Sequence, residues 1–343
     1  MMPMSKINPS SLKQYTIFFV LLGLMAIFSL VSPYFLTVRN LTNIITQNTY
    51  FIIVAVGLSF VMISGGIDLS VGYQMSLVGV ITAMLMVVYN QPPWLAVAAG
   101  LLLGVVLGLI NGLIVTRIRI FPLIATLATA VIFQGISYMI SQSKTFRGYP
   151  EEFLLITRAK VLGIPFDVFL ALVIVLVASL VYSEMIFGLR LMALGGNEEA
   201  SRRAGINTRG MKVAVYSICG FLTAVATMVM IAKANTTHSS FGPGTEFTAL
   251  TAAIVGGVSF MGGEGSVPAL VGGVFVLAVL GNGMQLAGWG TYPQYVVRGV
   301  ILLGAVAFDE YQKSARLRPR GRSSGDEHQR SFRTRLGPGK ETR

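Results

Sequence analysis

Two long uncharged apolar runs flank one strongly polar stretch at residues 195–207, which reads Gly195-Gly196-Asn197-Glu198-Glu199-Ala200-Ser201-Arg202-Arg203-Ala204-Gly205-Ile206-Asn207. Asn197 can cap the start of a helix. The two acids after it suit the positively polarised first turn, and the two arginines suit the last turn. Gly205 can then end the helix in a left-handed conformation. The stretch predicts a short helix in a loop, which is either a docking element for a soluble partner or a solvated segment without one.

The composition places the chain among integral membrane proteins. Hydrophobic residues make up 54% of the 343 residues and charged residues only 12%, far from the usage of a soluble domain. A bilayer core about 30 Å thick is crossed by about 20 helical residues, so the chain divides into membrane spans. The net charge of +12 is interpreted as a topology signal, because Lys and Arg collect in cytoplasmic loops. We therefore expect membrane lipid, and no nucleic acid, among its partners.

Ten apolar segments predict an all-α integral membrane fold with about ten transmembrane helices. The eighth segment is short, so it is expected to be broken or to enter only part of the membrane. In the fourth segment glycine recurs every four residues from Gly100 to Gly112, which predicts close helix packing. The segments are residues 15–35, 46–64, 70–89, 94–115, 122–141, 166–187, 212–232, 247–261, 267–287 and 294–309.

Both termini are predicted to lie in the cytoplasm. This arrangement puts 19 of the 26 Lys and Arg residues on the inner side, although the basic tail supplies many of them. Residues 1–14 then form a cytoplasmic N-terminal segment, and residues 15–312 form the transmembrane domain with a cytoplasmic loop at 188–211. Residues 313–343 form a basic tail that is low in apolar residues, which predicts disorder and electrostatic attraction to anionic lipid.

A short internal similarity links the two halves of the chain. Residues 61–72, Val-Met-Ile-Ser-Gly-Gly-Ile-Asp-Leu-Ser-Val-Gly, resemble residues 258–267, Val-Ser-Phe-Met-Gly-Gly-Glu-Gly-Ser-Val, and each stretch joins two apolar segments. The similarity predicts two related structural repeats, a frequent plan in transporters. Chance similarity between two glycine-rich pieces is the alternative.

Asp68 and Glu264 are the acids that these two junctions place between closely spaced apolar segments. A charged group at mid-bilayer costs about 2.5–3.5 kcal/mol on insertion scales, so such residues usually face a bundle interior or water. The glycine pair before each acid relaxes the backbone. We expect a pathway or gate at broken helices, with simple N-capping by Asp68 or Ser70 as the alternative. The candidate residues are Gly65, Gly66, Asp68, Ser70, Gly262, Gly263, Glu264 and Ser266.

Several amide side chains lie within or beside the apolar segments. Amides both donate and accept hydrogen bonds, which suits a neutral hydroxylated solute. Hydrogen bonds between helices are the alternative for any single residue. These amides are Asn43, Gln47, Asn48, Asn111, Gln134, Asn282, Gln285 and Gln294.

Catalytic and metal-binding motifs are missing from the sequence. It has no Gly-x-x-x-x-Gly-Lys-Ser/Thr motif, so we expect the chain not to hydrolyse ATP by itself. Its two histidines lie outside the apolar segments, and a lone cysteine, Cys219, offers no metal-ligand cluster. We predict no metal and no cofactor on this chain. An ion-coupled secondary transporter remains an alternative, although only Asp68, Glu184, Glu264 and Arg298 supply ionisable groups near the segments.

The motifs in combination resemble one known family. Residues 63–72, residues 193–207 and the glycine-rich pieces at 254–257 and 262–266 are similar, in this order, to the permeases of ribose-type bacterial sugar ABC importers, which are relatives of the branched-chain amino-acid permeases. The resemblance covers about residues 40–312.

The resemblance implies a multi-pass permease subunit of the bacterial inner membrane that moves a monosaccharide or related polar solute. Its implied partners are a second permease subunit, identical or homologous, an ATPase subunit that binds the ATP and Mg²⁺, and a periplasmic or lipid-anchored solute-binding protein. A branched-chain amino-acid permease and a membrane enzyme or scaffold are the other readings. The residues implied to couple with the ATPase are Asn197, Glu198, Glu199, Ala200, Arg202, Arg203, Ala204, Gly205 and Ile206.

Overall fold

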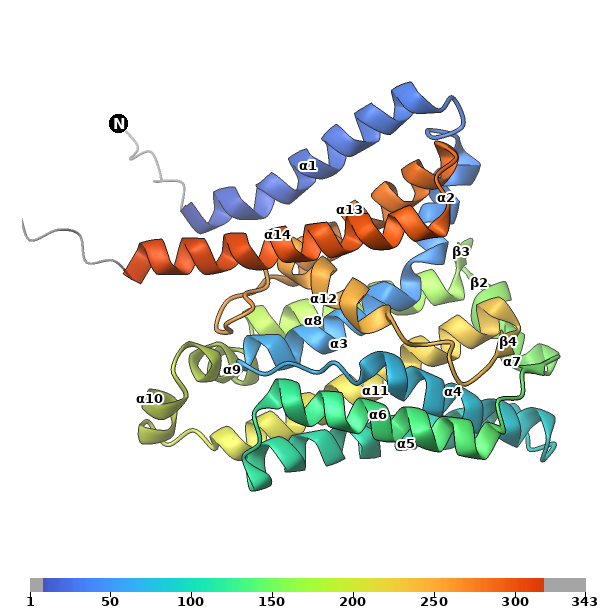
Figure 1. Cartoon of the computed structure of the whole chain (residues 1–343), viewed down its shortest axis with the longest axis horizontal. Helices are drawn as coiled ribbons and strands as arrows, with labels where there is room; N and C mark the ends of the chain where they lie inside the picture. The colour runs from blue at the N-terminus through green and yellow to red at the C-terminus, as the bar shows by residue number, and fades with distance from the viewer. Residues whose placement is uncertain (1–8, 318–343) are drawn as a thin grey trace, which may run out of the picture.

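The computed structural model describes residues 9–317, with side chains over residues 16–311. It is a bundle of long helices that run in roughly the same direction, with short elements at both ends (Figure 1). The helices are α1 (Pro9–Val31), α2 (Val38–Gln47), α3 (Thr49–Ile63), α4 (Val71–Val87), α5 (Pro93–Leu113), α6 (Pro122–Ser141), α7 (Glu151–Arg158), α8 (Phe166–Ser183), α9 (Ile186–Gly196), α10 (Glu198–Arg203), α11 (Thr208–Ala234), α12 (Thr245–Val255), α13 (Val267–Leu286) and α14 (Thr291–Leu317).

A few short elements complete the fold. A π-helical turn, η1 (Ile114–Ile118), extends α5. Strand β1 (Phe146–Arg147) pairs antiparallel with β4 (Thr236–Thr237), and β2 (Lys160–Val161) pairs antiparallel with β3 (Ile164–Pro165). These strands lie at the end of the molecule that is opposite to α10 (Figure 1).

The membrane class is confirmed, because the described part of the chain is largely helical and apolar. Six of its helices are long and apolar enough to cross a membrane, or seven if α2 and α3, bent by 40° at Asn48, form one span. Each predicted segment contains a helix, but several of these helices are too short for a full crossing. The shorter apolar helices are Val71–Val87, Ile186–Gly196 and Thr245–Val255. Helix α1 has 23 residues in all, of which Thr16–Val31 have described side chains. The eighth segment is indeed shortened, since α12 ends at Val255.

Three predicted boundaries differ from the structure. Helix α1 begins at Pro9 instead of residue 15, and α14 continues past residue 312 to Leu317. The remainder of the predicted N-terminal segment and tail, residues 1–8 and 318–343, lies outside the described residues. The predicted loop at 188–211 is mostly helical, because α9 fills its first part. Apolar side chains that pack inside the protein, Leu191 and Leu194, hold α9 against the bundle.

Helix α11 is the centre of the bundle and the most buried of the six long spans. It packs against α3, α4 and α5. On α5 the glycine ladder faces α11: a Cβ on Gly104 would lie 2.5 Å from the Gly220 carbonyl oxygen, and a Cβ on Gly112 would lie 2.9 Å from Val213 Cα. The predicted close helix packing is therefore confirmed.

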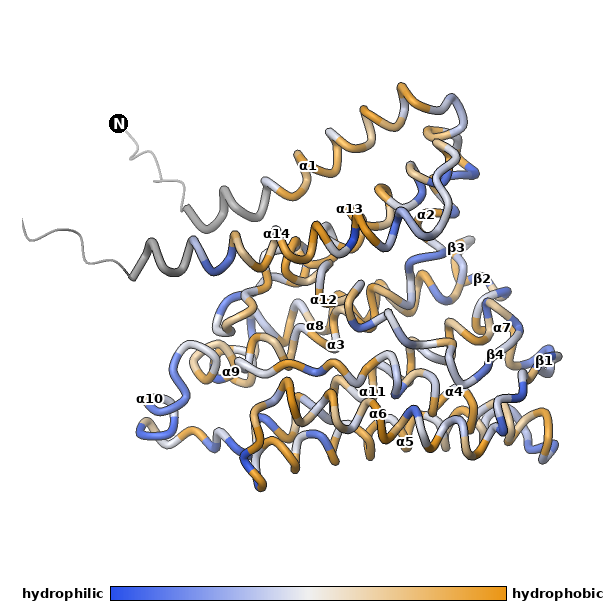
Figure 2. Tube along the Cα trace, viewed as in Figure 1, coloured by the Kyte–Doolittle hydropathy of each residue, from blue (hydrophilic) through white to orange (hydrophobic). Residues whose placement is uncertain are grey.

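Polar and apolar residues separate along the length of the molecule. The long helices are mainly apolar, whereas α10 and the connections near β1 and α7 at the opposite end are hydrophilic (Figure 2). The described start of α1 and the described end of α14 lie at the same end as α10 (Figure 1). The molecule therefore has one polar end with α10 and both described chain ends, and a second polar end with the small strands.

Candidate functional site

The short helix predicted in the polar stretch is confirmed as α10. The Asn197 side-chain oxygen accepts a hydrogen bond from the Ala200 backbone N–H at 2.9 Å, which caps the helix. Gly205 has a φ of +85°, a left-handed conformation that glycine adopts without steric cost, and its N–H donates to the Arg202 carbonyl at 3.1 Å. Both ends of α10 are thus fixed by the residues that the sequence pattern indicated.

Helix α10 projects from the bundle and is held to it by a few specific contacts. All of its residues are exposed except Ser201, which is buried. Glu199 pairs with Arg203 along the helix, and Glu198 pairs with Lys212 on α11, each at 2.6 Å. The outward surface combines charged side chains with the exposed small residues Ala200, Ala204 and Gly205.

Three glycine pairs meet directly beside α10. The Gly263 N–H donates to the Ile63 carbonyl oxygen at 3.0 Å. A Cβ on Gly195 would overlap that same carbonyl oxygen and would lie 2.5 Å from the Gly263 nitrogen. A Cβ on Gly262 would lie 2.8 Å from Gly65 Cα. We call Ile63, Gly65, Gly195, Gly262 and Gly263 the glycine junction, because three chain segments touch there backbone to backbone.

The glycine junction joins parts of the sequence that were predicted to have separate roles. Gly195 is in the last turn of α9, two positions before the cap of α10, whereas Gly65 follows α3 and Gly262 follows α12. The structure therefore brings together the glycines of both candidate gate stretches and places them against the base of α10. Gly66 lies beside them, where a Cβ would be 2.9 Å from the Tyr216 hydroxyl, and Ser266 is the N-cap position of α13.

Asp68 lies in the connection between α3 and α4 and is completely buried. Its Oδ1 accepts hydrogen bonds from the Ser70 N–H at 2.9 Å and from the Ser70 hydroxyl at 2.6 Å. The amides of Gln74 and Asn111 both donate to the Ser70 hydroxyl oxygen at 2.7 Å. No Lys, Arg or His in the described part of the chain pairs with the Asp68 carboxylate. The result is a buried carboxylate that a hydroxyl and two amides support.

This geometry bears on the capping alternative. Ser70 occupies the N-cap position of α4, but its side chain makes no capping hydrogen bond, so capping by Ser70 is wrong. Asp68 and Glu264 are also not equivalent, since Glu264 is exposed while Asp68 is buried. The contact between the two stretches is made by their glycines, and the two acids lie in different environments.

Sequence reasoning missed three polar residues near these breaks. Thr126 accepts a hydrogen bond from the Leu69 N–H at 3.2 Å, and the Tyr216 hydroxyl donates to the Ile67 carbonyl at 3.1 Å. Glu246 is buried at the start of α12, where its carboxylate accepts from the Gly244 N–H at 3.0 Å. The predicted eighth segment begins at residue 247 and therefore does not include Glu246. The signal was an acid in the first turn of a short helix.

A cavity of about 610 Å³ lies between α2 and α3 on one side and α12, α13 and α14 on the other. We call it the amide cavity, because its polar lining is mostly Asn and Gln. Six of the eight amides noted in the sequence line it: Asn43, Gln47, Asn48, Asn282, Gln285 and Gln294. The other two serve elsewhere, since Asn111 supports Asp68 and Gln134 donates to the Ser239 carbonyl at 2.7 Å.

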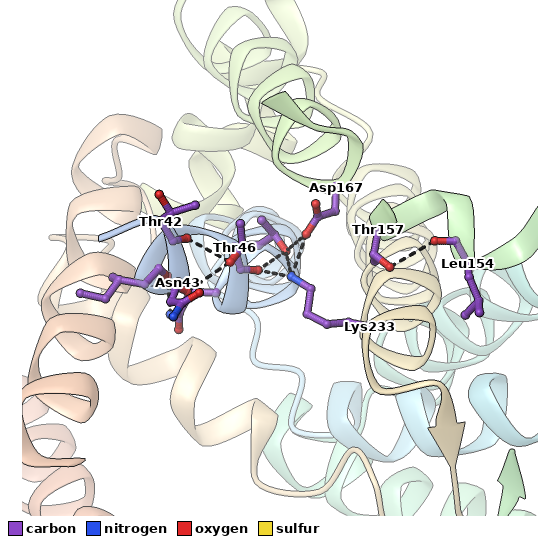
Figure 3. A network of polar contacts seen from close by, with 10 residues as sticks. Thr42, Asn43, Thr46, Leu154, Thr157, Asp167 and Lys233 are labelled. Atoms are coloured by element: carbon purple, nitrogen blue, oxygen red, sulfur yellow. Dashed lines mark hydrogen bonds and ion pairs between the residues drawn. The ribbon is translucent and has the colours of Figure 1, made fainter. Parts of the chain in front are cut away.

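A second polar cluster holds the bend between α2 and α3 (Figure 3). The Lys233 ammonium on α11 pairs with the Asp167 carboxylate at the start of α8 at 2.7 Å, and it also donates to the Thr46 carbonyl at the end of α2. Thr49 at the start of α3 donates to Asp167 at 3.0 Å. The Asp167 side chain is 1% exposed and that of Lys233 is 18% exposed. One cation thus ties α2 and α3 to α8 and α11.

Removal of this cation is expected to destabilise the protein. Lys233→Met leaves the Asp167 carboxylate buried without its counter-charge, so we expect a loss of about 3 kcal/mol in unfolding free energy. Arg158→Met is the matched control, because its ion pair with Glu151 is exposed and contributes about 0–1 kcal/mol. Thermal unfolding in detergent should show a clearly lower midpoint for Lys233→Met than for Arg158→Met. Equal midpoints would show that the pair adds no stability.

Comparison with known proteins identifies the family. Residues 40–306 match the family described as branched-chain amino acid transport system / permease component. The chain is 36% identical over 297 residues to the D-allose transport system permease protein AlsC of Escherichia coli, which covers 86% of this chain and 91% of that protein. It is 34% identical over 304 residues to the ribose import permease protein RbsC of Haemophilus influenzae, with 88% and 94% covered.

A third relative completes the comparison. The L-arabinose transport system permease protein AraH of Escherichia coli is 34% identical over 303 residues, which is 88% of this chain and 92% of that protein. No solved structure matches the chain. The chain therefore belongs to the branched-chain amino acid transport system permease family, as a multi-pass inner-membrane subunit of a transporter that is not itself an enzyme.

Proposed function

We propose that the chain is the membrane-spanning subunit of an ATP-driven importer for a monosaccharide. The observation that carries this proposal is the similarity, over most of the chain, to permeases for D-allose, ribose and L-arabinose. Such a subunit works with an ATPase that binds ATP and Mg²⁺, with a second permease subunit of the same or a homologous sequence, and with a periplasmic or lipid-anchored sugar-binding protein. The chain itself holds no cofactor in this proposal.

Helix α10 would be the coupling helix that docks on the ATPase. Its exposed charged and small side chains offer a partner both ion pairs and close backbone approach. The caps at Asn197 and Gly205 and the ion pair to Lys212 make it a rigid projection, which suits transmission of a rigid-body movement. In this proposal the end of the molecule that carries α10 faces the cytoplasm, with both chain termini, and the small strands face outward.

The glycine junction would carry the movement of α10 into the membrane. Because Gly195 is in backbone contact with Ile63 and Gly263, α9 and α10 cannot shift without displacing the breaks after α3 and α12. Interiors packed this tightly pass displacement on rather than absorb it. ATP binding would then favour one state of the pathway through contacts that differ between the two states.

Two structural repeats would explain why both breaks meet at this junction. Each break follows a helix that is short for a span, α3 with 15 residues and α12 with 11. Each then has a glycine with positive φ, +76° at Gly65 and +88° at Gly262, before the next helix begins. Paired broken helices in corresponding positions of two halves are typical of transporters built from repeats.

Asp68 would hold the first break in its working geometry. Asp68→Asn keeps one acceptor oxygen but replaces the other with an N–H₂ group. This donor would face the amide donors of Gln74 and Asn111, which now point at the Asp68 carboxylate, so sugar uptake should fall several-fold. Asp68→Ala should lower uptake further, because it leaves the Ser70 donors unsatisfied at about 1–3 kcal/mol each. Uptake rates of the two variants at equal membrane abundance check this order. An unchanged rate for Asp68→Asn would instead favour a purely local capping role.

Reconstitution tests the proposed function. The purified permease is placed in proteoliposomes with its ATPase and binding protein, and uptake of D-ribose, D-allose and L-arabinose is followed with ATP, with an ion gradient, or with neither. We expect uptake of at least one sugar with ATP alone. Uptake that follows an ion gradient without the ATPase would support the secondary-transporter alternative. Uptake of leucine but of no sugar would support the amino-acid function that the family description names.

A further inference from the structure

We infer that the amide cavity is a binding site that the monosaccharide occupies inside the permease during transport. This inference rests on the proposed function. Its volume of about 610 Å³ lies in the usual range of small-molecule sites, about 300–1,000 Å³. Its lining residues come mainly from α2, the second half of α13 and the start of α14. These elements come together toward the end of the bundle opposite to α10 (Figure 1). A solute released at that end would reach it before the glycine junction.

The polar side chains of the amide cavity fall into two groups: a pair that is hydrogen-bonded between its two walls, and amides without a hydrogen-bond partner in the described part of the chain. Asn40 on α2 and Asn282 on α13 exchange two hydrogen bonds of 2.9 Å, which fix the distance between the two walls. In the described part of the chain, by contrast, the amides of Gln47, Gln285 and Gln294 have no hydrogen-bond partner. These free amides come from α2, α13 and α14 and line one cavity.

Free amides in a membrane bundle point to a polar occupant. Gln47 and Gln285 are exposed and Gln294 is half-buried, so their amides are accessible from the cavity. In a membrane, an amide without a protein partner needs water or a polar solute, because an unpaired polar group in hydrocarbon costs free energy. Each amide offers two donors and one acceptor, which matches the hydroxyl groups of a sugar, since a hydroxyl also both donates and accepts. A preformed wall lowers the entropy cost of binding.

The charge and shape of the lining narrow the solute class. Arg298 is the ionisable residue among the lining side chains, and no acid lines the cavity, so nothing there would select a cation. Phe51 and the apolar residues Val274 and Leu277 supply a nonpolar wall for the C–H faces of a sugar ring. A neutral, hydroxyl-rich ring with polar edges and apolar faces fits this lining better than an amino acid, whose ammonium group would find no acid.

The test removes free amides without disturbing the wall pair. Gln285→Leu and Gln294→Leu, alone and together, are reconstituted with the ATPase and loaded binding protein. We expect uptake of the transported sugar to fall at least about tenfold, equivalent to about 1.4 kcal/mol, while stimulation of ATP hydrolysis by the binding protein is retained. Gln285→Asn and Gln294→Asn should restore part of the uptake. Gln91→Leu, an amide in the connection between α4 and α5, is the matched control and should behave as wild type.

The outcomes separate this inference from the proposed function. If the wild-type complex moves no sugar with ATP, the proposed function fails first. If the wild-type complex moves sugar, and the leucine variants take up sugar as fast as Gln91→Leu does, then only the inferred sugar site is wrong. Loss of ATPase stimulation together with uptake would also overturn the site, because the amides would then act in assembly.

A labelling measurement checks occupancy without relying on turnover. The single native cysteine, Cys219, is buried, so Gln285→Cys introduces one accessible thiol. A maleimide should react with it more slowly in the presence of the transported sugar at high concentration, whereas sucrose should have no effect. Ser143→Cys, on an exposed loop, should react at the same rate with either sugar. If the transported sugar slowed the maleimide reaction equally at both introduced cysteines, or at neither, the result would contradict a sugar site in the amide cavity.

Discussion

Reversal of the two acids of α10, Glu198→Lys with Glu199→Lys, should abolish ATP-driven uptake while the protein stays in the membrane. The substitution makes four of the six residues of α10 basic and removes the ion pair to Lys212. The surface that we propose to be complementary to the ATPase would then become repulsive. Like charges brought together at an interface cost several kcal/mol, and each 1.4 kcal/mol is about tenfold in affinity. Uptake and co-purification of the ATPase should both fall by at least about a hundredfold.

The control for this variant lies at the other end of the molecule. Glu151→Lys also reverses an exposed acid that forms an ion pair, here with Arg158 on α7. It should leave both uptake and ATPase co-purification unchanged, because α7 is remote from α10 (Figure 1). Normal uptake by the α10 variant, at wild-type abundance in the membrane, would mean that α10 does not dock the ATPase.

Gly195→Ala should be the most damaging single-methyl change in the chain's membrane domain. The new Cβ would overlap the Ile63 carbonyl oxygen and approach the Gly263 nitrogen, and both neighbours are backbone atoms that cannot rotate away. The glycine junction would have to open, with loss of the hydrogen bond from Gly263 to Ile63. We expect uptake to fall at least about a hundredfold, while ATPase still binds because α10 itself is unchanged.

Its neighbour provides a close control. Gly196 is also in the last turn of α9, but a Cβ there would meet no atom within 4 Å. Gly196→Ala should therefore transport at nearly the wild-type rate, with a slightly more stable helix end. The comparison uses the same amino-acid change at adjacent positions, and uptake per molecule of ATP hydrolysed is the measurement. Equal coupling in both variants would show that the glycine junction does not transmit the movement.

The short-range features of the fold could be predicted from the sequence. The cap at Asn197 and the left-handed Gly205 follow from local backbone chemistry, and both are present. The glycine ladder of α5 indicated close packing, and it lies against α11. The family motifs also pointed to the correct family. In each case the signal lies within a few residues or in a short ordered set of motifs.

Features that depend on distant segments could not be predicted. The sequence shows that the two glycine stretches resemble each other, but their contact with each other and with Gly195 appears only in three dimensions. Hydropathy placed Glu246 outside a segment and gave no reason to pair Lys233 with Asp167, since partners on separate helices leave no spacing pattern. Helix α2 was likewise not predicted, because Val38–Gln47 is polar on average and lies almost wholly before the apolar segment at 46–64 that contains α3.

The side of the membrane on which α10 lies tests the central proposal most directly. In a Cys219→Ser background, Ala200→Cys places one thiol on the exposed surface of α10. A membrane-impermeant maleimide should label it in inside-out vesicles but not in right-side-out vesicles, and bound ATPase should protect it. Labelling in right-side-out vesicles, or labelling that the ATPase does not alter, would contradict the account.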